Sequence, residues 1–569
     1  MSRVRNYIGL ACTVHDPAVA VVGPDGEVRF AEATERWVQC KRAHHVPPDE
    51  PGRIRHILDT YCDAGAEIVV AHSWLRRRWK GALFRAAWAV GERRVSPLLR
   101  PTMIGQMAAY EIAGLNLEYR LFEADPHGRP VEKLYFDHHL THAATSAFAS
   151  PFTEAVCAVI DGHGEKTADS FFHYRNGGFR SLRPTLVRDF ARNASLGVFY
   201  SALCVACGFD PSRGEEWKVM GLAPYGRKDA RLYAMMRDQL RVDGLRVRGN
   251  NWEIVERLHA LAPPRGREPI ESCDVAFTGQ LVFSEVAGEL LQNLHRLGLG
   301  DTLVLSGGCA LNSAFNGRIP EQTGWKRVFV HSAPADDGNA IGAAQLAHRR
   351  DHPDTPPPAR LGSPYLGSRL DPAALRNVQS LGGLRSTRPE GVSVARHVAG
   401  LLAAGKIVGW ARGRAEFGPR ALGNRSILAD PRAAGIKDRL NARVKFREEF
   451  RPFAPAILEE HADAWFEGAL PTPYMERALR FRPEMAARVP GVVHVDGTGR
   501  LQTVSRSLAP EFHALITEFH ARTGVPIVLN TSFNVMGRPI VHSVEDAIAV
   551  YFTSGLDALV LEDDVYEKP

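Results

Sequence analysis

Two histidines four residues apart are the first candidates for chemistry in this chain. His138 and His142 would project from one face of a helix, and two imidazoles on one face can bind a transition metal. Such a pair needs a third ligand, and the candidates are Asp336 and Asp337, which precede a glycine and a run of small residues. The same residues are also compatible with two core histidines and an aspartate that caps a helix. Their spacing alone leaves both interpretations open.

Two glycine-rich loops follow apolar, β-rich runs. The loops at 161–167 (Asp-Gly-His-Gly-Glu-Lys-Thr) and 306–312 (Ser-Gly-Gly-Cys-Ala-Leu-Asn) would let backbone N–H groups approach phosphate oxygens, although either could be an ordinary turn. Neither loop matches the P-loop or the GxGxxG pattern, which disfavours those two nucleotide-binding folds.

Basic residues are concentrated between 412 and 451, interleaved with glycine, proline and phenylalanine. Cations this dense are costly to bury unless an anion or a carboxylate neutralises them, and the planar guanidinium group suits phosphate oxygens. We interpret the region as an anion site rather than a solvated basic run, because apolar residues are interleaved so closely. A polar stretch at 530–534 (Asn-Thr-Ser-Phe-Asn) follows a β-rich run and is compatible with phosphate or ribose binding, or with a simple turn.

Strands and helices must alternate to position these loops. Helical patterns such as 283–294 lie between short β-rich runs at 7–10, 18–22, 155–160 and 302–305. This alternation indicates an α/β architecture whose strand ends present functional loops. The Gly-Pro-Asp-Gly turn at 23–26, flanked by β-branched residues, predicts a hairpin. The two glycine loops are about 145 residues apart, which fits a duplicated α/β core that holds a nucleotide between its halves. A proline-rich stretch predicts a linker at 351–367, between a domain at 1–350 and a domain at 368–569.

Composition excludes several classes of protein. The 569 residues include 70 Lys and Arg and 64 Asp and Glu, a net charge of +6, and 45% are hydrophobic. This balance argues against a dedicated nucleic-acid binder, and no apolar run approaches the roughly 18–20 residues that a transmembrane helix needs. The start of the chain lacks the apolar stretch of a signal peptide. We therefore expect a cytoplasmic protein with neither a nucleic-acid nor a membrane partner.

Two local features have alternative interpretations. Cys204 and Cys207 lie in an apolar stretch that favours a buried helix over a redox or zinc site, because no second cysteine pair completes a site. Interleaved Trp and Arg at 74–94 would suit contact with a membrane surface or RNA, but a basic amphipathic helix with its tryptophans packed inward is the favoured interpretation.

Six motifs together resemble the O-carbamoyltransferases, which include nodulation-factor and antibiotic carbamoyltransferases. They lie at 137–142, 161–165, 216–226, 416–426, 450–455 and 529–534. The resemblance implies an α/β chain with an N-terminal domain of the actin-like ATPase (ASKHA) fold, similar to the threonylcarbamoyl transferase of tRNA modification, and a YrdC-like C-terminal domain.

The same resemblance implies an activity. Carbamoyl phosphate and ATP would form carbamoyl adenylate in the C-terminal domain. The N-terminal domain would then transfer the carbamoyl group to a hydroxyl of a small-molecule acceptor, an antibiotic such as the aminoglycoside tobramycin. A divalent metal of the iron type, Fe(2+), would assist.

Site residues follow from matching this sequence to the family motifs. The metal ligands would be His138, His142 and Asp336. Carbamoyl phosphate would contact Arg420, Arg451, Arg500, Asn530 and Ser532. ATP would contact Lys445, Arg447 and Ser532, and carbamoyl adenylate would contact Gly162, Gly307, Gly308 and Asn312.

His15 follows the first β-rich run, where this fold presents active-site residues. It is the predicted general base, with Asp16 orienting it, although a histidine that caps a turn would look the same. Two rival functions remain: a tRNA threonylcarbamoyl transferase whose RNA contact is 74–94, and a non-catalytic nucleotide-sensing protein of the same fold. Because the intermediate would be reactive toward water, we expect an enclosed passage between the two domains.

Overall fold

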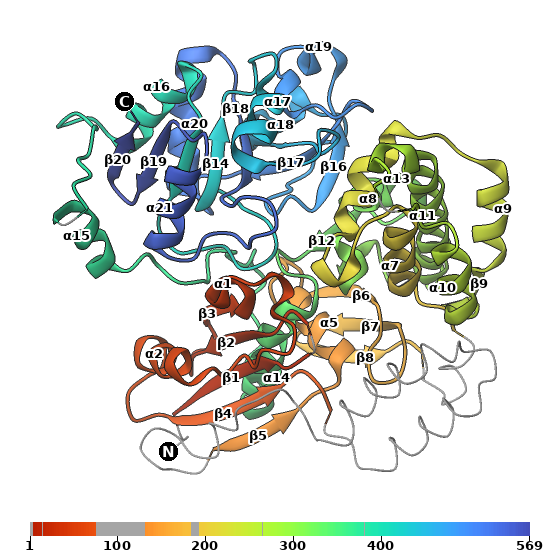
Figure 1. The fold of residues 1–569 in the computed structure, drawn as a ribbon. Coiled ribbons are helices and arrows are strands. Elements are labelled where there is room, and N and C mark those ends of the chain that lie inside the picture. The colour runs from red at the N-terminus through yellow and green to blue at the C-terminus, as the bar shows by residue number, and fades with distance from the viewer. Residues whose placement is uncertain are drawn as a thin grey trace.

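The computed structural model describes residues 4–13, 15–75, 131–183, 193–264, 266–380 and 382–568. Three large sheets surrounded by helices build this part of the chain (Figure 1). Most of the Trp- and Arg-rich segment at 74–94 lies outside the described residues. Among those residues, no helix combines the length and the apolar character that crossing a bilayer requires.

The first sheet has the strand order β3-β2-β1-β4-β5. β1 pairs antiparallel with β2 and parallel with β4, and the predicted turn at 23–26 joins β2 and β3 as an antiparallel hairpin. β1 and β2 are almost wholly buried, as their apolar sequences require. The strands are β1 (Arg5–Ala11), β2 (Ala18–Val22), β3 (Val28–Ala33), β4 (Glu67–His72) and β5 (Glu132–Tyr135).

The second sheet repeats the arrangement of the first. Its order is β12-β11-β6-β7-β8, in which β6 pairs antiparallel with β7 and parallel with β11, as β1 does with β2 and β4. This repeated topology confirms the predicted duplicated core and is that of the actin-like ATPase fold. The strands are β6 (Glu154–Ile160), β7 (Asp169–Arg175), β8 (Gly178–Ser181), β11 (Thr302–Ser306) and β12 (Arg327–Val330).

Two helices cross between these sheets. α5 (His138–Phe148) follows the first sheet and packs on β6 and β11 of the second, whereas α14 (Asn339–Asp351) follows the second sheet and packs on β1 and β2 of the first. The two helices also pack on each other, which gives a sheet–helix–helix–sheet sandwich (Figure 1). Buried alanines of α14 allow the close approach, and a Cβ at Gly9 of β1 would lie 1.7 Å from the carbonyl oxygen of Ala340.

The Gly9→Ala substitution is expected to destabilise the protein by about 3 kcal/mol, because α14 cannot approach β1 over an added methyl group. Gly400→Ala is the matched control, since its Cβ would meet no atom within 4 Å and alanine favours the helix that holds it. Urea denaturation should show a lower midpoint for Gly9→Ala and an unchanged or higher one for Gly400→Ala. Equal midpoints for the two variants would contradict this packing argument.

A group of helices covers the far end of the second sheet. The long helix α11 (Cys273–His295) packs against α7, α8, α9 and α13, and it contains the helix predicted at 283–294. α7 holds Cys204 and is followed at once by Cys207; both cysteines are buried, and the predicted buried helix is confirmed. The other members are α7 (Leu196–Ala206), α8 (Glu216–Leu222), α9 (Ala230–Asp238), α10 (Asn251–His259), α12 (Ser313–Asn316) and α13 (Ile319–Thr323), with the hairpin β9 (Arg241–Asp243) and β10 (Arg246–Arg248).

The C-terminal part is built on one mixed sheet of eight strands, in the order β16-β17-β15-β18-β14-β13-β19-β20. Buried strands and helices make one large apolar core here. The strands are β13 (Val408–Ala411), β14 (Arg425–Ala429), β15 (Ala454–Leu458), β16 (Arg477–Arg480), β17 (Thr498–Val504), β18 (Ile527–Ser532), β19 (Ala558–Leu561) and β20 (Asp564–Glu567). The main helices are α15 (Pro372–Ser380), α16 (Val394–Ala403), α17 (Ile436–Leu440), α20 (Pro510–Thr523) and α21 (Val544–Thr553). The YrdC-like assignment of this part and the domain limits stay predictions.

Candidate functional site

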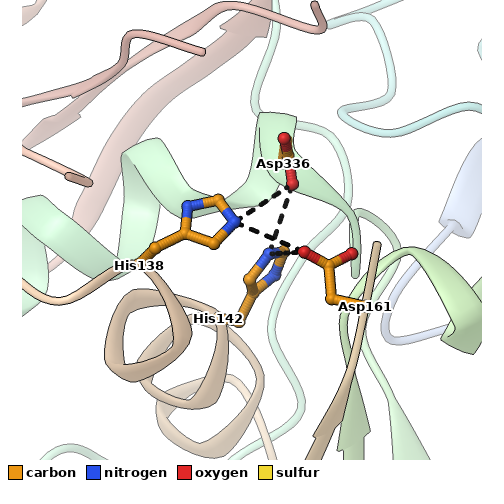
Figure 2. Close-up of side chains that lie close together, drawn as sticks. All are labelled: His138, His142, Asp161 and Asp336. Carbon is orange, nitrogen blue, oxygen red and sulfur yellow. Dashed lines mark ion pairs between the residues drawn. The ribbon is translucent and has the colours of Figure 1, made fainter. Parts of the chain in front are cut away.

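Four side chains converge between the two sheets of the N-terminal part (Figure 2). His138 and His142 lie one turn apart on α5, Asp161 directly follows β6, and Asp336 begins a short helical turn before α14. The Nε2 atom of His138 lies 3.4 Å from Asp161 Oδ2 and 3.5 Å from Asp336 Oδ1. The corresponding distances from His142 Nε2 are 3.7 and 3.3 Å.

Local hydrogen bonds hold these groups in place. The Asp137 side chain caps α5 by accepting from the N–H of Leu140, so the helix begins at His138. Nδ1 of His142 lies 3.1 Å from the carbonyl oxygen of Pro334, and a proton there leaves Nε2 free to bind a cation. Asp161 Oδ1 accepts from the N–H of Gly308 at 2.8 Å, which aims its other oxygen at the histidines.

The electrostatics of this group favour a cation. Burial by itself lowers the pKa of His138, but the carboxylates of Asp336 and Asp161 raise that pKa well above its ordinary value. Burial raises the pKa of Asp161, yet its contacts with His138 and His142 outweigh burial and lower it well below its ordinary value. Two carboxylates and two imidazoles thus share a buried space with a strong preference for positive charge.

The four residues fit a divalent metal ion. One ligand atom from each lies within 4.8 Å of the others. The Nε2 atoms of both histidines are buried and accept or donate no hydrogen bond among the described residues. Two nitrogen and two carboxylate ligands suit iron, zinc or manganese, and the two negative charges match a divalent ion.

His15 lies beside this group. Its Nδ1 is 3.0 Å from Asp16 Oδ2 and 3.8 Å from Asp336 Oδ2. Arg42 donates to Asp16 Oδ2 through Nη2 at 2.9 Å and holds that carboxylate against the imidazole. Burial lowers the pKa of His15, but the hydrogen bond and charge of Asp16 outweigh it and raise the pKa above its ordinary value. When Nδ1–H donates to Asp16, Nε2 carries the lone pair of a base.

One cavity of about 1360 Å³ connects this region with the C-terminal sheet. Its wall includes His15, Asp161 and Asp336 at one end, and basic side chains of the C-terminal part at the other. Those basic residues include Arg420, Lys445, Arg447, Arg451, Arg500 and Arg538.

The basic end of the cavity is short of negative charge. Burial, together with the nearby Arg451, lowers the pKa of Arg500 to about 10. Burial and the charge of Arg500 also lower the pKa of Arg420 well below its ordinary value. Neither Arg420 nor Arg500 forms an ion pair with any described residue. A bound anion with several oxygens would supply the missing charge.

Lys445 holds the loop that follows β18. Its ammonium group donates to the carbonyl oxygen of Ser532 at 2.7 Å and to Asn534 Oδ1 at 2.6 Å. The hydroxyl of Ser532 donates to the same Asn534 oxygen, so Ser532 lines the cavity in a fixed position. Asn530 donates to Gln502, and its Oδ1 atom is buried with no partner among the described residues.

The residues predicted to hold the adenylate divide into two groups. Gly162, Gly308 and Asn312 line the cavity. Gly307 does not; its left-handed backbone (φ +87°) brings it against β6, where a Cβ would lie 2.4 Å from the Ile160 oxygen. Asn312 also caps α12 by accepting from the N–H of Phe315, which fixes its amide in the cavity wall.

The sequence motifs place Asp161 only in a phosphate loop and give Arg42 no role. The one local signal for Asp161 is its position directly after a buried strand, where α/β folds present functional residues. Arg42 carries no motif, and its chain segment reaches Asp16 only through a left-handed backbone at Arg42 (φ +59°).

Comparisons with known proteins show the family of the chain. The family model "Carbamoyltransferase N-terminus" matches residues 120–345, and "Carbamoyltransferase C-terminus" matches residues 399–568. Nodulation protein NolO of Bradyrhizobium diazoefficiens is 38% identical over 75% of this chain and 77% of its own length. Nodulation protein NolNO of Sinorhizobium fredii is 36% identical over 99% of this chain and 81% of its own length.

Among solved structures, full-length HypF in its phosphate- and nucleotide-bound form is 12% identical, with a TM-score of 0.35, over 62% of this chain and 47% of its own. The first match covers His138, His142, Asp161 and Asp336, and the second covers the basic residues at the other end of the cavity, whereas His15 and Asp16 lie outside both matches. The chain belongs to the carbamoyltransferase family and is an enzyme of that class.

Proposed function

We propose that this enzyme is an ATP-dependent O-carbamoyltransferase. Its substrates would be carbamoyl phosphate, ATP and a hydroxylated small molecule, an antibiotic such as the aminoglycoside tobramycin. The observation that carries the proposal is the cavity itself: basic side chains gather at one end, where Arg420 and Arg500 have no ion-pair partner among the described residues, and a His–Asp pair lies beside a metal-type site at the other. The first end suits two phosphate-bearing substrates, and the second suits attack by a hydroxyl group.

The basic end would form the intermediate. Carbamoyl phosphate and water give carbamate and phosphate, and a carbamate oxygen then attacks the α-phosphorus of ATP and releases pyrophosphate. Arg420, Arg451 and Arg500 would bind phosphate oxygens, with Asn530 and Ser532 completing the contacts. Lys445 and Arg447 would stabilise the nucleotide phosphates. Gly162, Gly308 and Asn312 would hold the carbamoyl adenylate after it moves along the cavity.

The other end would carry out the transfer. The acceptor hydroxyl attacks the carbamoyl carbon, AMP leaves, and His15 Nε2 takes the hydroxyl proton while Asp16 orients the ring. His138, His142, Asp161 and Asp336 would hold a divalent metal, and Fe(2+) is our proposal for it. Such an ion supplies Lewis-acid stabilisation of negative charge. All eight cysteines are free, which is typical of a reducing compartment, and we propose a cytoplasmic location.

Separating the two ends by mutation tests the proposal. Arg420→Ala is expected to lower pyrophosphate release that depends on carbamoyl phosphate by about 100-fold, because it removes a phosphate contact from the low-dielectric cavity. Synthetic carbamoyl adenylate should restore product formation, measured by mass spectrometry as a gain of one carbamoyl group on tobramycin or another hydroxylated antibiotic. If the adenylate fails to restore product, two separate sites are excluded. ATP binding without pyrophosphate release by the wild type would instead favour a nucleotide-sensing protein.

A further inference from the structure

One helix of the N-terminal part lies directly against the predicted carbamoyl phosphate site. α8 belongs to the Glu-Trp-Lys-Val-Met-Gly motif at 216–221, for which the proposed chemistry has no role. The ammonium group of Lys218 lies 2.9 Å from Glu448 Oε1, across to the loop that precedes β15. It also lies 2.8 Å from Glu215 Oε1, and the Lys218 side chain is only 8% exposed. This buried ion pair joins two segments 230 residues apart.

Glu448 bridges Lys218 and Arg451. Its second oxygen, Oε2, accepts from Arg451 Nη1 at 2.9 Å. Burial opposes the charge of Glu448, but Lys218 and Arg451 lower its pKa to about 2, so the carboxylate stays ionised between two cations. Glu448 is absent from the described residues that line the cavity, whereas Arg451 lines it. Trp217 and Lys218 line it as well, so Glu448 borders the cavity through the two cations with which it pairs.

Trp217 fixes the other side of the same guanidinium group. The central carbon of the Arg451 guanidinium lies 4.1 Å from the centre of the Trp217 ring, a cation–π geometry. The Arg451 side chain is 9% exposed, and its Nε is buried with no hydrogen-bond partner among the described residues. The guanidinium is thus held by an ion pair and by an aromatic face, and it keeps N–H capacity for another acceptor.

We infer that Trp217, Lys218 and Glu448 are positioning residues that fix Arg451 for binding carbamoyl phosphate. The inference rests on the proposed function, and it makes α8 of the N-terminal part a component of a site built on the C-terminal sheet. An arginine that is already fixed loses little conformational entropy when it binds an anion. The anion therefore binds more tightly than it would to a mobile arginine, whose ordering would reduce the binding free energy. Without Glu448, the buried Lys218 and Arg451 would also repel each other.

A purely stabilising role for these contacts predicts a different set of effects from a positioning role. If Lys218 and Glu448 only held the parts together, their loss would lower thermal stability and impair every step alike. A positioning role predicts a selective loss: weaker binding of carbamoyl phosphate and of phosphate, with ATP binding and the transfer step almost unchanged. The two roles are therefore separable in the full-length enzyme.

The experiment compares full-length Glu448→Gln, Lys218→Met and Trp217→Leu with the wild type. We expect a roughly 10- to 100-fold rise in KM for carbamoyl phosphate in pyrophosphate release, because a small misplacement of a contact has effects of this size. KM for ATP and the rate of transfer from preformed carbamoyl adenylate should change by less than about twofold, which is small beside the tenfold change that about 1.4 kcal/mol of binding free energy produces. The conservative variants Trp217→Phe and Lys218→Arg should have a KM for carbamoyl phosphate close to that of the wild type. Lys326→Met is the control, since it removes an exposed ion pair with Asp301 of similar length, 2.8 Å.

Calorimetric titration with inorganic phosphate provides a readout that needs no catalysis. Weaker phosphate binding by Glu448→Gln than by the wild type supports the positioning role. Absence of pyrophosphate release by the wild type would overturn the proposed function but would leave this binding result standing. Wild-type phosphate affinity and wild-type KM in all three variants would overturn the inference. So would a parallel loss of ATP binding, transfer rate and melting temperature.

Discussion

Replacing His15 by alanine is expected to slow carbamoyl transfer from preformed carbamoyl adenylate by about 10²–10⁴-fold, the usual contribution of a general base. In the proposed mechanism the imidazole takes the acceptor proton, and Asp16, itself held by Arg42, lies against the ring. Mass spectrometry of the acceptor in single-turnover reactions measures the rate. Because the proposed site of adenylate formation is at the other end of the cavity, release of pyrophosphate should continue at the wild-type rate.

His173→Ala is the matched control for this change. His173 also pairs with a carboxylate, Glu154, at 2.8 Å, but it lies on β7 and is not among the residues that line the cavity. This variant should transfer carbamoyl groups like the wild type. Transfer by His15→Ala within a few-fold of the wild type would show that another group removes the proton.

The second large effect is expected for the metal-type site. Asp161→Asn keeps an oxygen that can accept from the N–H of Gly308 but removes one of two negative charges next to the histidines. The affinity for a divalent ion should fall by at least about 100-fold, since even changes in residues behind a ligand reduce affinity 10- to 100-fold. Titration with Fe(2+) and Zn(2+), followed by elemental analysis after dialysis, measures the ion retained.

Asp337→Asn provides the comparison. Asp337 is buried next to Asp336 in the sequence but is outside the four-residue group. Burial and the charges of Asp16 and Glu35 raise its pKa to about 7, so an amide resembles its protonated form. This variant should retain the ion. Equal loss of the ion from both variants would show that general negative charge, rather than ligation by Asp161, controls binding.

Much of the fold could be predicted from local patterns in the sequence. The hairpin at 23–26, the duplicated core and the helix at 283–294 depend on short-range signals, and the structure contains all three. His138 and His142 could be paired because helical spacing is itself a local signal. The assignment of Asp336 as their third ligand comes from the motif resemblance rather than from spacing.

The parts that escaped prediction depend on contacts between distant segments. Asp161 joins the histidines because α5 packs on β6 and β11, which is a property of the folded chain. The Lys218–Glu448 pair joins segments that share no pattern, and each residue alone looks like an ordinary surface charge. Arg42 reaches Asp16 through a backbone conformation that non-glycine residues seldom adopt, so no propensity argument would place it there.

The size of the cavity has a consequence for competition with bulk water. A single molecule confined to 1360 Å³ is present at an effective concentration of about 1 M, far above what a diffusing intermediate would reach in solution. Carbamoyl adenylate held there would meet a bound acceptor many times before escaping. A scavenger such as hydroxylamine, added outside in millimolar amounts, should therefore capture little of it while the acceptor is bound.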